Sequence, residues 1–277
     1  PWSPLALGQP WTPQVSGTDK GLFSVHFPDP YTGYICGEAG MLLKTSNAGK
    51  EWVQLDPGVS NWLMSTHFTG RDTGYICGDK GLLMKTVNGG NTWSTLTSNT
   101  SNALNSIFFS SVNTGFVVGN GGTVLKTTDA GSTWVPQSAG TTEPLYGIFM
   151  SDDSNGHIVG TADFHTGNQA IVKATTDGGL LWKSQPAVTK KGLSSVFFVS
   201  KDAGCVAGNG VIIRTVNSGT SWQVVYSGSI NLNALFFPDA DTGYSCGAGG
   251  EIVKSSDGGK TWDPDITANG LDLYDLH

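Results

Sequence analysis

Short apolar segments separated by turn-forming residues recur along the whole chain. The first group comprises Leu22–Phe27, Gly33–Gly37, Met41–Thr45 and Trp52–Leu55, which are rich in β-branched and aromatic residues and bounded by Gly, Asp, Asn and Pro. These features predict four β-strands joined by tight turns. No segment shows helical periodicity over about eleven residues, so we expect an all-β protein.

This four-strand pattern repeats with a period near 41 residues. Each repeat carries one motif, Ser/Thr-x-Asp/Asn-x-Gly-x-x-Trp, which occurs at Thr45–Trp52, Thr86–Trp93, Thr127–Trp134, Thr175–Trp182, Thr215–Trp222 and Ser255–Trp262. Counting Trp11, the intervals between the motif tryptophans are 41, 41, 41, 48, 40 and 40 residues. Four antiparallel strands per repeat at such a period predict a β-propeller.

The number of blades depends on the two ends of the chain. Six complete repeats run from Leu22 to about residue 267, preceded by a strand-like segment, Trp11–Val15, and followed by another, Leu273–His277. We therefore predict a seven-bladed ring whose seventh blade is incomplete in this sequence, with a six-bladed ring as the alternative. Residues 1–10 are predicted to be an N-terminal extension, and residues 11–277 a single propeller domain.

The repeated motif is predicted to be a structural turn between the third and fourth strands. Asp or Asn in a turn hydrogen-bonds backbone two residues further on, and Gly takes the positive φ that the turn requires. The Trp ring then packs against the blade. We assign this structural role to Asn47, Asn88, Asp129, Asp177, Asn217 and Asp257.

The motif resembles the Asp-box, or BNR, repeat of sialidases and many other propellers. The fuller repeat at residues 32–52, TGYICGEAGMLLKTSNAGKEW, is similar to that of the Ycf48/Hcf136-like propellers, the photosystem II assembly-factor family. The resemblance covers residues 11–277 and implies a propeller that docks on subunits of a membrane complex. That family uses a basic patch, whereas the corresponding face of this sequence offers few cations, among them Lys80, Lys190 and Lys191.

Two departures from the repeat suggest a binding surface at the mouth of the central channel. The second position of each innermost strand varies, and the fourth repeat carries an insertion at Thr161–Ala170. Binding residues favour loops on a rigid scaffold. The alternative explanations are that packing constrains the varying strand position only weakly, and that the insertion is a tolerated surface loop without function. The predicted partner-binding residues are Phe23, Trp62, Met64, Asn105, Tyr146, Asp163, Phe164, His165, Lys190, Lys191, Asn233 and Tyr274.

The histidines and cysteines fall into columns of the repeat. His26, His67 and His277 share a column that other repeats fill with Phe, so we interpret it as interblade packing and predict no metal site. Three of the four cysteines share a column with Val, which predicts buried free thiols and no disulfide; all four are Cys36, Cys77, Cys205 and Cys246.

Composition excludes some classes of function. The chain has 277 residues, a net charge of −7 and two arginines, so it lacks the basic stripe that nucleic-acid binding requires. Its longest apolar runs are four to six residues, too short for a transmembrane helix. The Gly/Ser/Thr/Asn-rich composition suits a secreted, periplasmic or cell-surface protein, and the family resemblance favours a bacterial one.

The sequence does not predict an enzyme. A sialidase, as the Asp-box resemblance implies, clamps its substrate with an arginine cluster, which Arg71 and Arg214 cannot supply. A nucleophile elbow, a P-loop and the zinc motif H-E-x-x-H are absent from the sequence. We therefore predict a non-enzymatic scaffold without cofactors that binds a protein or peptide partner. The alternative is a carbohydrate-binding or glycoside-hydrolase-like propeller.

Overall fold

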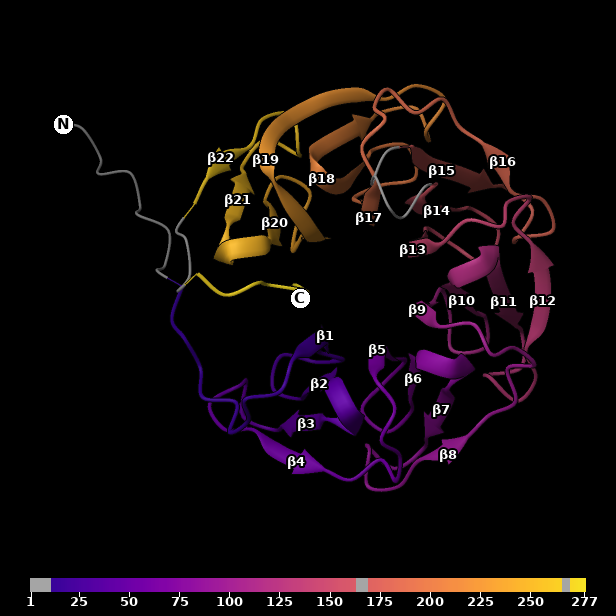
Figure 1. The fold of residues 1–277 in the computed structure, drawn as a ribbon, viewed down its shortest axis with the longest axis vertical. Coiled ribbons are helices and arrows are strands. Elements are labelled where there is room, and N and C mark those ends of the chain that lie inside the picture. The colour runs from indigo at the N-terminus through magenta and orange to yellow at the C-terminus, as the bar shows by residue number, and fades with distance from the viewer. Residues whose placement is uncertain (1–10, 163–168, 266–269) are drawn as a thin grey trace.

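The computed structural model describes residues 11–162, 169–265 and 270–277, so the predicted extension over residues 1–10 lies outside the described residues. Antiparallel sheets stand side by side around a central axis, with the first strand of each nearest the axis (Figure 1). The first sheet has the order β1 (Leu22–His26), β2 (Gly33–Gly37), β3 (Leu42–Thr45) and β4 (Val53–Leu55).

Three further sheets repeat this order. They are β5 (Leu63–Phe68), β6 (Gly74–Gly78), β7 (Leu83–Thr86) and β8 (Ser94–Thr95); β9 (Leu104–Phe109), β10 (Gly115–Gly119), β11 (Thr123–Thr127) and β12 (Val135–Ser138); and β13 (Leu145–Met150), β14 (Gly156–Thr161), β15 (Ala170–Thr175) and β16 (Lys183–Ser184). The described residues hold no helix that is long and apolar enough to span a bilayer.

The last two sequence repeats share one sheet. Its six strands are β17 (Leu193–Phe198), β18 (Gly204–Thr215), β19 (Gln223–Phe236), β20 (Gly243–Gly247), β21 (Ile252–Ser255) and β22 (Asp263–Pro264). Strand β19 is 14 residues long, and it pairs with β18 through its first half and with β20 through its second. In the described residues, four single 3₁₀ turns each join two successive strands: η1 (Glu38–Gly40), η2 (Asp79–Gly81), η3 (Asn120–Gly122) and, between β20 and β21, η4 (Ala248–Gly250).

The prediction of an all-β propeller built from four-stranded antiparallel units is confirmed, but the predicted number of blades is wrong. The described residues form five hydrogen-bonded sheets, hence five blades, and neither seven nor six. One cause is β19, which runs without a break from one repeat into the next. The other is that the end segments Trp11–Val15 and Leu273–His277 pair with no strand in the described part of the chain.

The C-terminal segment, residues 270–277, nevertheless closes the ring. Leu273 N–H donates to the carbonyl of Gly247 at 2.9 Å, on the last sheet. Val25 N–H of β1 donates to Asp275 Oδ2, also at 2.9 Å. The segment thus connects the last sheet to the first, and Figure 1 shows it running inward between β20 and β1.

A buried hydroxyl organises each repeated turn. In the third repeat, Thr127 Oγ1 donates to Asp129 Oδ1 at 2.8 Å and accepts the N–H of Gly131 at 2.9 Å. The Asp129 carboxylate also accepts the N–H of Thr133 at 2.8 Å. Because these hydrogen bonds favour the ionised carboxylate, the pKa of Asp129 falls to about 2.

Four of the turns also receive a basic side chain from the preceding repeat. Lys126 Nζ on β11 donates to the carbonyl of Gly178 at 2.7 Å, and it lies 5.3 Å from the ring centroid of Phe116. The same donation joins other neighbours: Lys44 to Gly89 at 2.7 Å, Lys85 to Ala130 at 2.6 Å and Arg214 Nε to Gly258 at 2.8 Å. We call this contact the turn clasp.

Aromatic stacking reinforces the turn clasp. Tyr34 of β2 stacks on Phe68 of β5 at a centroid distance of 3.6 Å, and Tyr75 stacks on Phe109 at 4.0 Å. Phe68 in turn covers Gly74, where a Cβ would lie 2.3 Å from the ring. The core therefore lies within and between the sheets, and it includes all four cysteines as buried free thiols, as predicted.

The turn clasp gives a testable stability difference. Lys126→Met removes the donor of a charged hydrogen bond, so we expect the free energy of unfolding to fall by about 2 kcal/mol in urea titration. Lys254→Met is the matched control, because Lys254 holds the same repeat position and lies 5.4 Å from the Tyr244 ring but has no hydrogen-bond acceptor among the described residues. It should cost only about 0.5 kcal/mol. Equal losses in both variants would refute the turn clasp.

Candidate partner-binding surface

An aromatic cluster stands on the face of the ring that carries turns η1 to η4, which we call the mouth face. Phe23 lies 5.6 Å, centroid to centroid, from both Trp62 and Tyr274. Trp62 is 49% exposed and Tyr274 is 44% exposed, which is unusual for such large rings. The three rings come from β1, from the loop before β5 and from the C-terminal segment, so ring closure brings them together.

Carboxylates on this face hold the loops that carry the aromatic cluster. Asp79 Oδ1 accepts the N–H of Trp62 at 3.0 Å and Asn61 Nδ2 at 2.8 Å. Glu38 Oε2 accepts the N–H of Gly21 at 3.3 Å, two residues before Phe23. Both carboxylates thus position the backbone of the loops that carry Phe23 and Trp62.

Three other predicted binding residues connect neighbouring segments of the propeller by hydrogen bonds. Asn105 Nδ2 donates to the carbonyl of Leu145 at 2.8 Å, and Asn233 Nδ2 donates to that of Leu273 at 2.8 Å. Lys191 Nζ donates to the carbonyl of Gly210 at 2.9 Å. These three side chains join neighbouring segments and do not gather with the aromatic cluster.

The remaining predicted binding residues are dispersed. Met64 lies on β5 and Tyr146 on β13, both partly buried, and burial raises the pKa of Tyr146 above its usual value. Lys190 is exposed. The predicted residues of the insertion, Asp163, Phe164 and His165, lie outside the described residues.

Three histidines meet at the axis beneath this face. His26 lies 4.6 Å from His67 and 4.7 Å from His277, centroid to centroid. Burial, and to a smaller extent the neighbouring imidazoles, lower the pKa of His26 to about 2 and that of His67 to about 4. Nowhere in the described residues do three or more His, Cys, Asp or Glu side chains form a metal-binding group.

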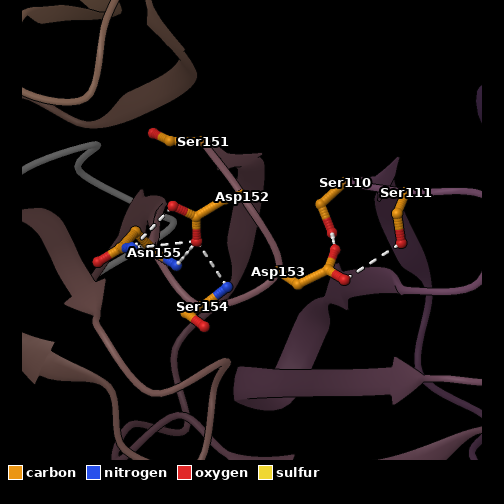
Figure 2. Close-up of a pocket in the computed structure, with 7 residues that line it drawn as sticks. All are labelled: Ser110, Ser111, Ser151, Asp152, Asp153, Ser154 and Asn155. Carbon is orange, nitrogen blue, oxygen red and sulfur yellow. Dashed lines mark hydrogen bonds between the residues drawn. The ribbon is translucent and has the colours of Figure 1, made fainter.

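A shallow depression of about 590 Å³ lies on the opposite face, between the turns that follow β9 and β13 (Figure 2). Asp153 accepts hydrogen bonds from Ser110 Oγ at 2.6 Å and Thr114 Oγ1 at 3.1 Å. Asp152 accepts the N–H groups of Ser154 at 2.7 Å and Asn155 at 2.8 Å. Because both carboxylates stabilise turns, this depression is structural.

Sequence analysis did not foresee a larger groove. It has a volume of about 1110 Å³ and lies between residues 11–25 and the C-terminal segment, with Ile252 at its wall. Trp11 borders it, packing edge-on against Tyr244 at 5.5 Å and donating from Nε1 to Asp265 Oδ2 at 3.3 Å.

A family model for the photosynthesis system II assembly factor YCF48 matches residues 4–101 and 48–144, which together span residues 4–144, or 141 of the 277 residues. The chain belongs to the Ycf48 family. No curated protein sequence matches it significantly.

Solved structures of Ycf48 proteins share the fold. One, described as YCF48 bound to D1 peptide, superposes with a TM-score of 0.75 at 19% identity, covering 93% of this chain and 85% of its own. YCF48 from Cyanidioschyzon merolae gives a TM-score of 0.73 at 19% identity, covering 93% and 89%. An ancestral GH74 enzyme gives 0.67 at 15% identity, and this chain spans 40% of its length.

The histidine cluster predicts an acid-sensitive ring. Unfolded histidines take up protons below about pH 6.5, whereas the folded state keeps His26 and His67 neutral, so stability present above pH 6.5 is lost as pH falls toward 4. Asp275 opposes this, because burial raises its pKa to about 6 and its protonation below that pH favours the folded state. From His26, His67 and Asp275 together we expect a loss of about 2 kcal/mol between pH 7 and pH 5. His157, whose pKa burial also lowers to about 4, adds to this loss.

Urea titrations at the two pH values measure this loss. His67→Phe, which installs the residue found at Phe108, should reduce the pH-dependent loss by about 1–2 kcal/mol. Phe108→Leu is the control, since it should lower stability equally at both pH values. An unchanged pH dependence in His67→Phe would contradict the assignment.

Proposed function

We propose that this Ycf48-family propeller is a non-enzymatic scaffold that captures a segment of a protein partner on its mouth face. The observation that carries the proposal is the exposed cluster of Phe23, Trp62 and Tyr274. Aromatic side chains are enriched at the energetic centres of protein interfaces. The solved complex of a Ycf48 protein with D1 peptide gives a precedent for peptide binding within this fold.

Hydrogen bonds hold the backbone that carries the aromatic cluster, so the cluster can bind a partner without changing its conformation. Asp79 and Glu38 fix the backbone beneath the rings, so little conformational entropy is lost when a partner docks. The chain carries a net charge of −7, which favours a partner segment that is neutral or basic around its apolar anchors. We place this activity in a secreted, periplasmic or cell-surface setting in a bacterium, as part of assembling or holding a larger complex.

A glycoside-hydrolase-like activity is the second candidate, favoured by the structural similarity to GH74 enzymes. Such an enzyme needs two carboxyl groups facing each other across a cleft. Glu251 is the carboxyl to test, because its Oε1 accepts a hydrogen bond from the Tyr226 hydroxyl at 3.0 Å while its Oε2 is buried and has no hydrogen-bond partner among the described residues. Glu38 and Asp79 are already used by backbone N–H groups.

The binding proposal is tested with the D1 peptide and a displayed peptide library, with affinities measured by calorimetry. Trp62→Ala and Tyr274→Ala should each weaken binding by about ten- to thirtyfold, as expected for aromatic anchors. Tyr31→Ala is the matched control, because Tyr31 is 64% exposed and lies in the turn after β1, on the opposite face.

Two results would overturn the proposal. One is a failure to obtain any binding peptide, and the other is equal affinity of the wild type and Trp62→Ala for every peptide. Hydrolysis of xyloglucan that Glu251→Gln abolishes would instead establish the enzymatic alternative.

A further inference from the structure

The repeated turn of the fourth repeat, Thr175–Trp182, exposes two adjacent leucines. Leu180 is 74% exposed and Leu181 is 53% exposed. The turn belongs to the sheet β13–β16, on the side of the ring away from residues 11–20 and from β22 (Figure 1), and it lies on the face opposite the mouth face. The turn and the loop that contacts it, residues 151–155, are both within the described residues.

The two leucines depart from the repeat. At these positions the other repeats carry polar residues, namely Lys50 and Glu51, Asn91 and Thr92, Ser132 and Thr133, Thr220 and Ser221, and Lys260 and Thr261. Single apolar residues are common on protein surfaces, but an adjacent exposed pair at otherwise polar positions is typical of a contact site.

Leu181 replaces a side chain that elsewhere holds the turn. Thr133 Oγ1 donates to Asp129 Oδ2, and Thr261 Oγ1 donates to Asp257 Oδ2, both at 2.7 Å. In the remaining repeats the Asn of the motif donates from Nδ2 to the residue at the same position, which is Glu51, Thr92 or Ser221. The side chain of Leu181 cannot make this hydrogen bond, so the fourth repeat exposes an apolar group in place of a stabilising contact.

The missing hydrogen bond leaves one carboxylate oxygen free. Asp177 Oδ1 accepts the Thr175 hydroxyl at 2.8 Å and the Leu181 N–H at 3.0 Å, whereas Oδ2 accepts no hydrogen bond from the described residues. Asp177 is exposed, and the hydrogen bonds from Leu181 and Thr175 lower its pKa, so it is ionised at neutral pH. A free ionised oxygen beside two exposed leucines can accept a hydrogen bond from an arginine or lysine of a partner.

The charge around the leucines indicates what kind of partner fits. The Gly178 N–H donates to the Ser154 carbonyl at 2.8 Å, which places the turn against the loop that carries Asp152 and Asp153. An acidic surface of this kind repels a second copy of itself and an anionic lipid surface, and it attracts a basic segment. The exposed carboxylates of this region outnumber its exposed ammonium groups: Asp152, Asp153, Asp177 and Asp202 against Lys183 and Lys201.

We propose that the turn of the fourth repeat is a second docking site, which binds a basic segment of a partner protein. Apolar side chains of the segment pack on Leu180 and Leu181, and an Arg or Lys beside them donates to Asp177 Oδ2. The site does not depend on the aromatic cluster, and a propeller that uses both surfaces holds two protein segments on opposite faces.

The test begins with a displayed peptide library selected on the wild type and counter-selected on Leu180→Asn/Leu181→Thr. This double variant carries the residues found at Asn91 and Thr92 in the second repeat, and its new Thr can donate to Asp177 as Thr133 does to Asp129. Its midpoint of urea unfolding should therefore equal or exceed that of the wild type. We expect selected peptides to carry Arg or Lys beside apolar residues, and synthetic copies to bind the double variant at least tenfold more weakly in calorimetry.

Three single variants define the contact. Asp177→Asn keeps the turn, since Asn occupies this position in other repeats, but removes the charge, so it should weaken binding by about two- to fivefold at low salt and less at high salt. Val87→Ser is the matched control, because Val87 is 66% exposed in the turn of the second repeat and its replacement should leave binding unchanged. Trp62→Ala should also leave binding unchanged, which separates this site from the mouth face.

Several outcomes would overturn the proposal. These are a failure to isolate such peptides, selected peptides without basic residues, equal affinity of the wild type and Asp177→Asn at low salt, or a loss of binding in Trp62→Ala. Sedimentation of the wild type as a dimer that the double variant does not form would mean that a second copy covers the leucines. Retention on phosphatidylglycerol vesicles that the double variant loses would assign the leucines to a membrane surface, again contrary to the proposal.

Discussion

The structure depends on the contact between one repeat and the turn of the next. A single four-stranded sheet of this chain has little core of its own, and its second-strand aromatic ring is covered by the neighbouring sheet, as Tyr34 is by Phe68. The cation that follows, such as Lys44, hydrogen-bonds a carbonyl of the neighbour's turn. Each sheet is therefore stabilised chiefly by its neighbour, and an open row of such sheets would leave one aromatic ring and one cation unsatisfied at its end.

Closure of the ring links stability to the binding surface. Phe23 and Trp62 come from adjacent sheets, but Tyr274 reaches them only because the C-terminal segment joins the last sheet to β1 through Asp275. The same segment places His277 against His26. A condition that destabilises the histidine packing thus also loosens the segment that carries Tyr274, so the proposed binding surface and the closure of the ring depend on the same local free energy.

Structural features that depend on residues close together in the chain could be predicted from the sequence, whereas features that depend on contacts between distant residues could not. The turn motif, its four-strand repeat and the buried cysteines follow from residues close together in the chain, whereas the contacts of Phe23 with Trp62 and Tyr274 are known only from the structure. The blade number failed at β19, where residues 223–236 lack the Pro found in several other connections between repeats. The acceptors of Asn105 and Asn233, the carbonyls of Leu145 and Leu273, could not be predicted from the sequence because they lie 40 residues away in the chain.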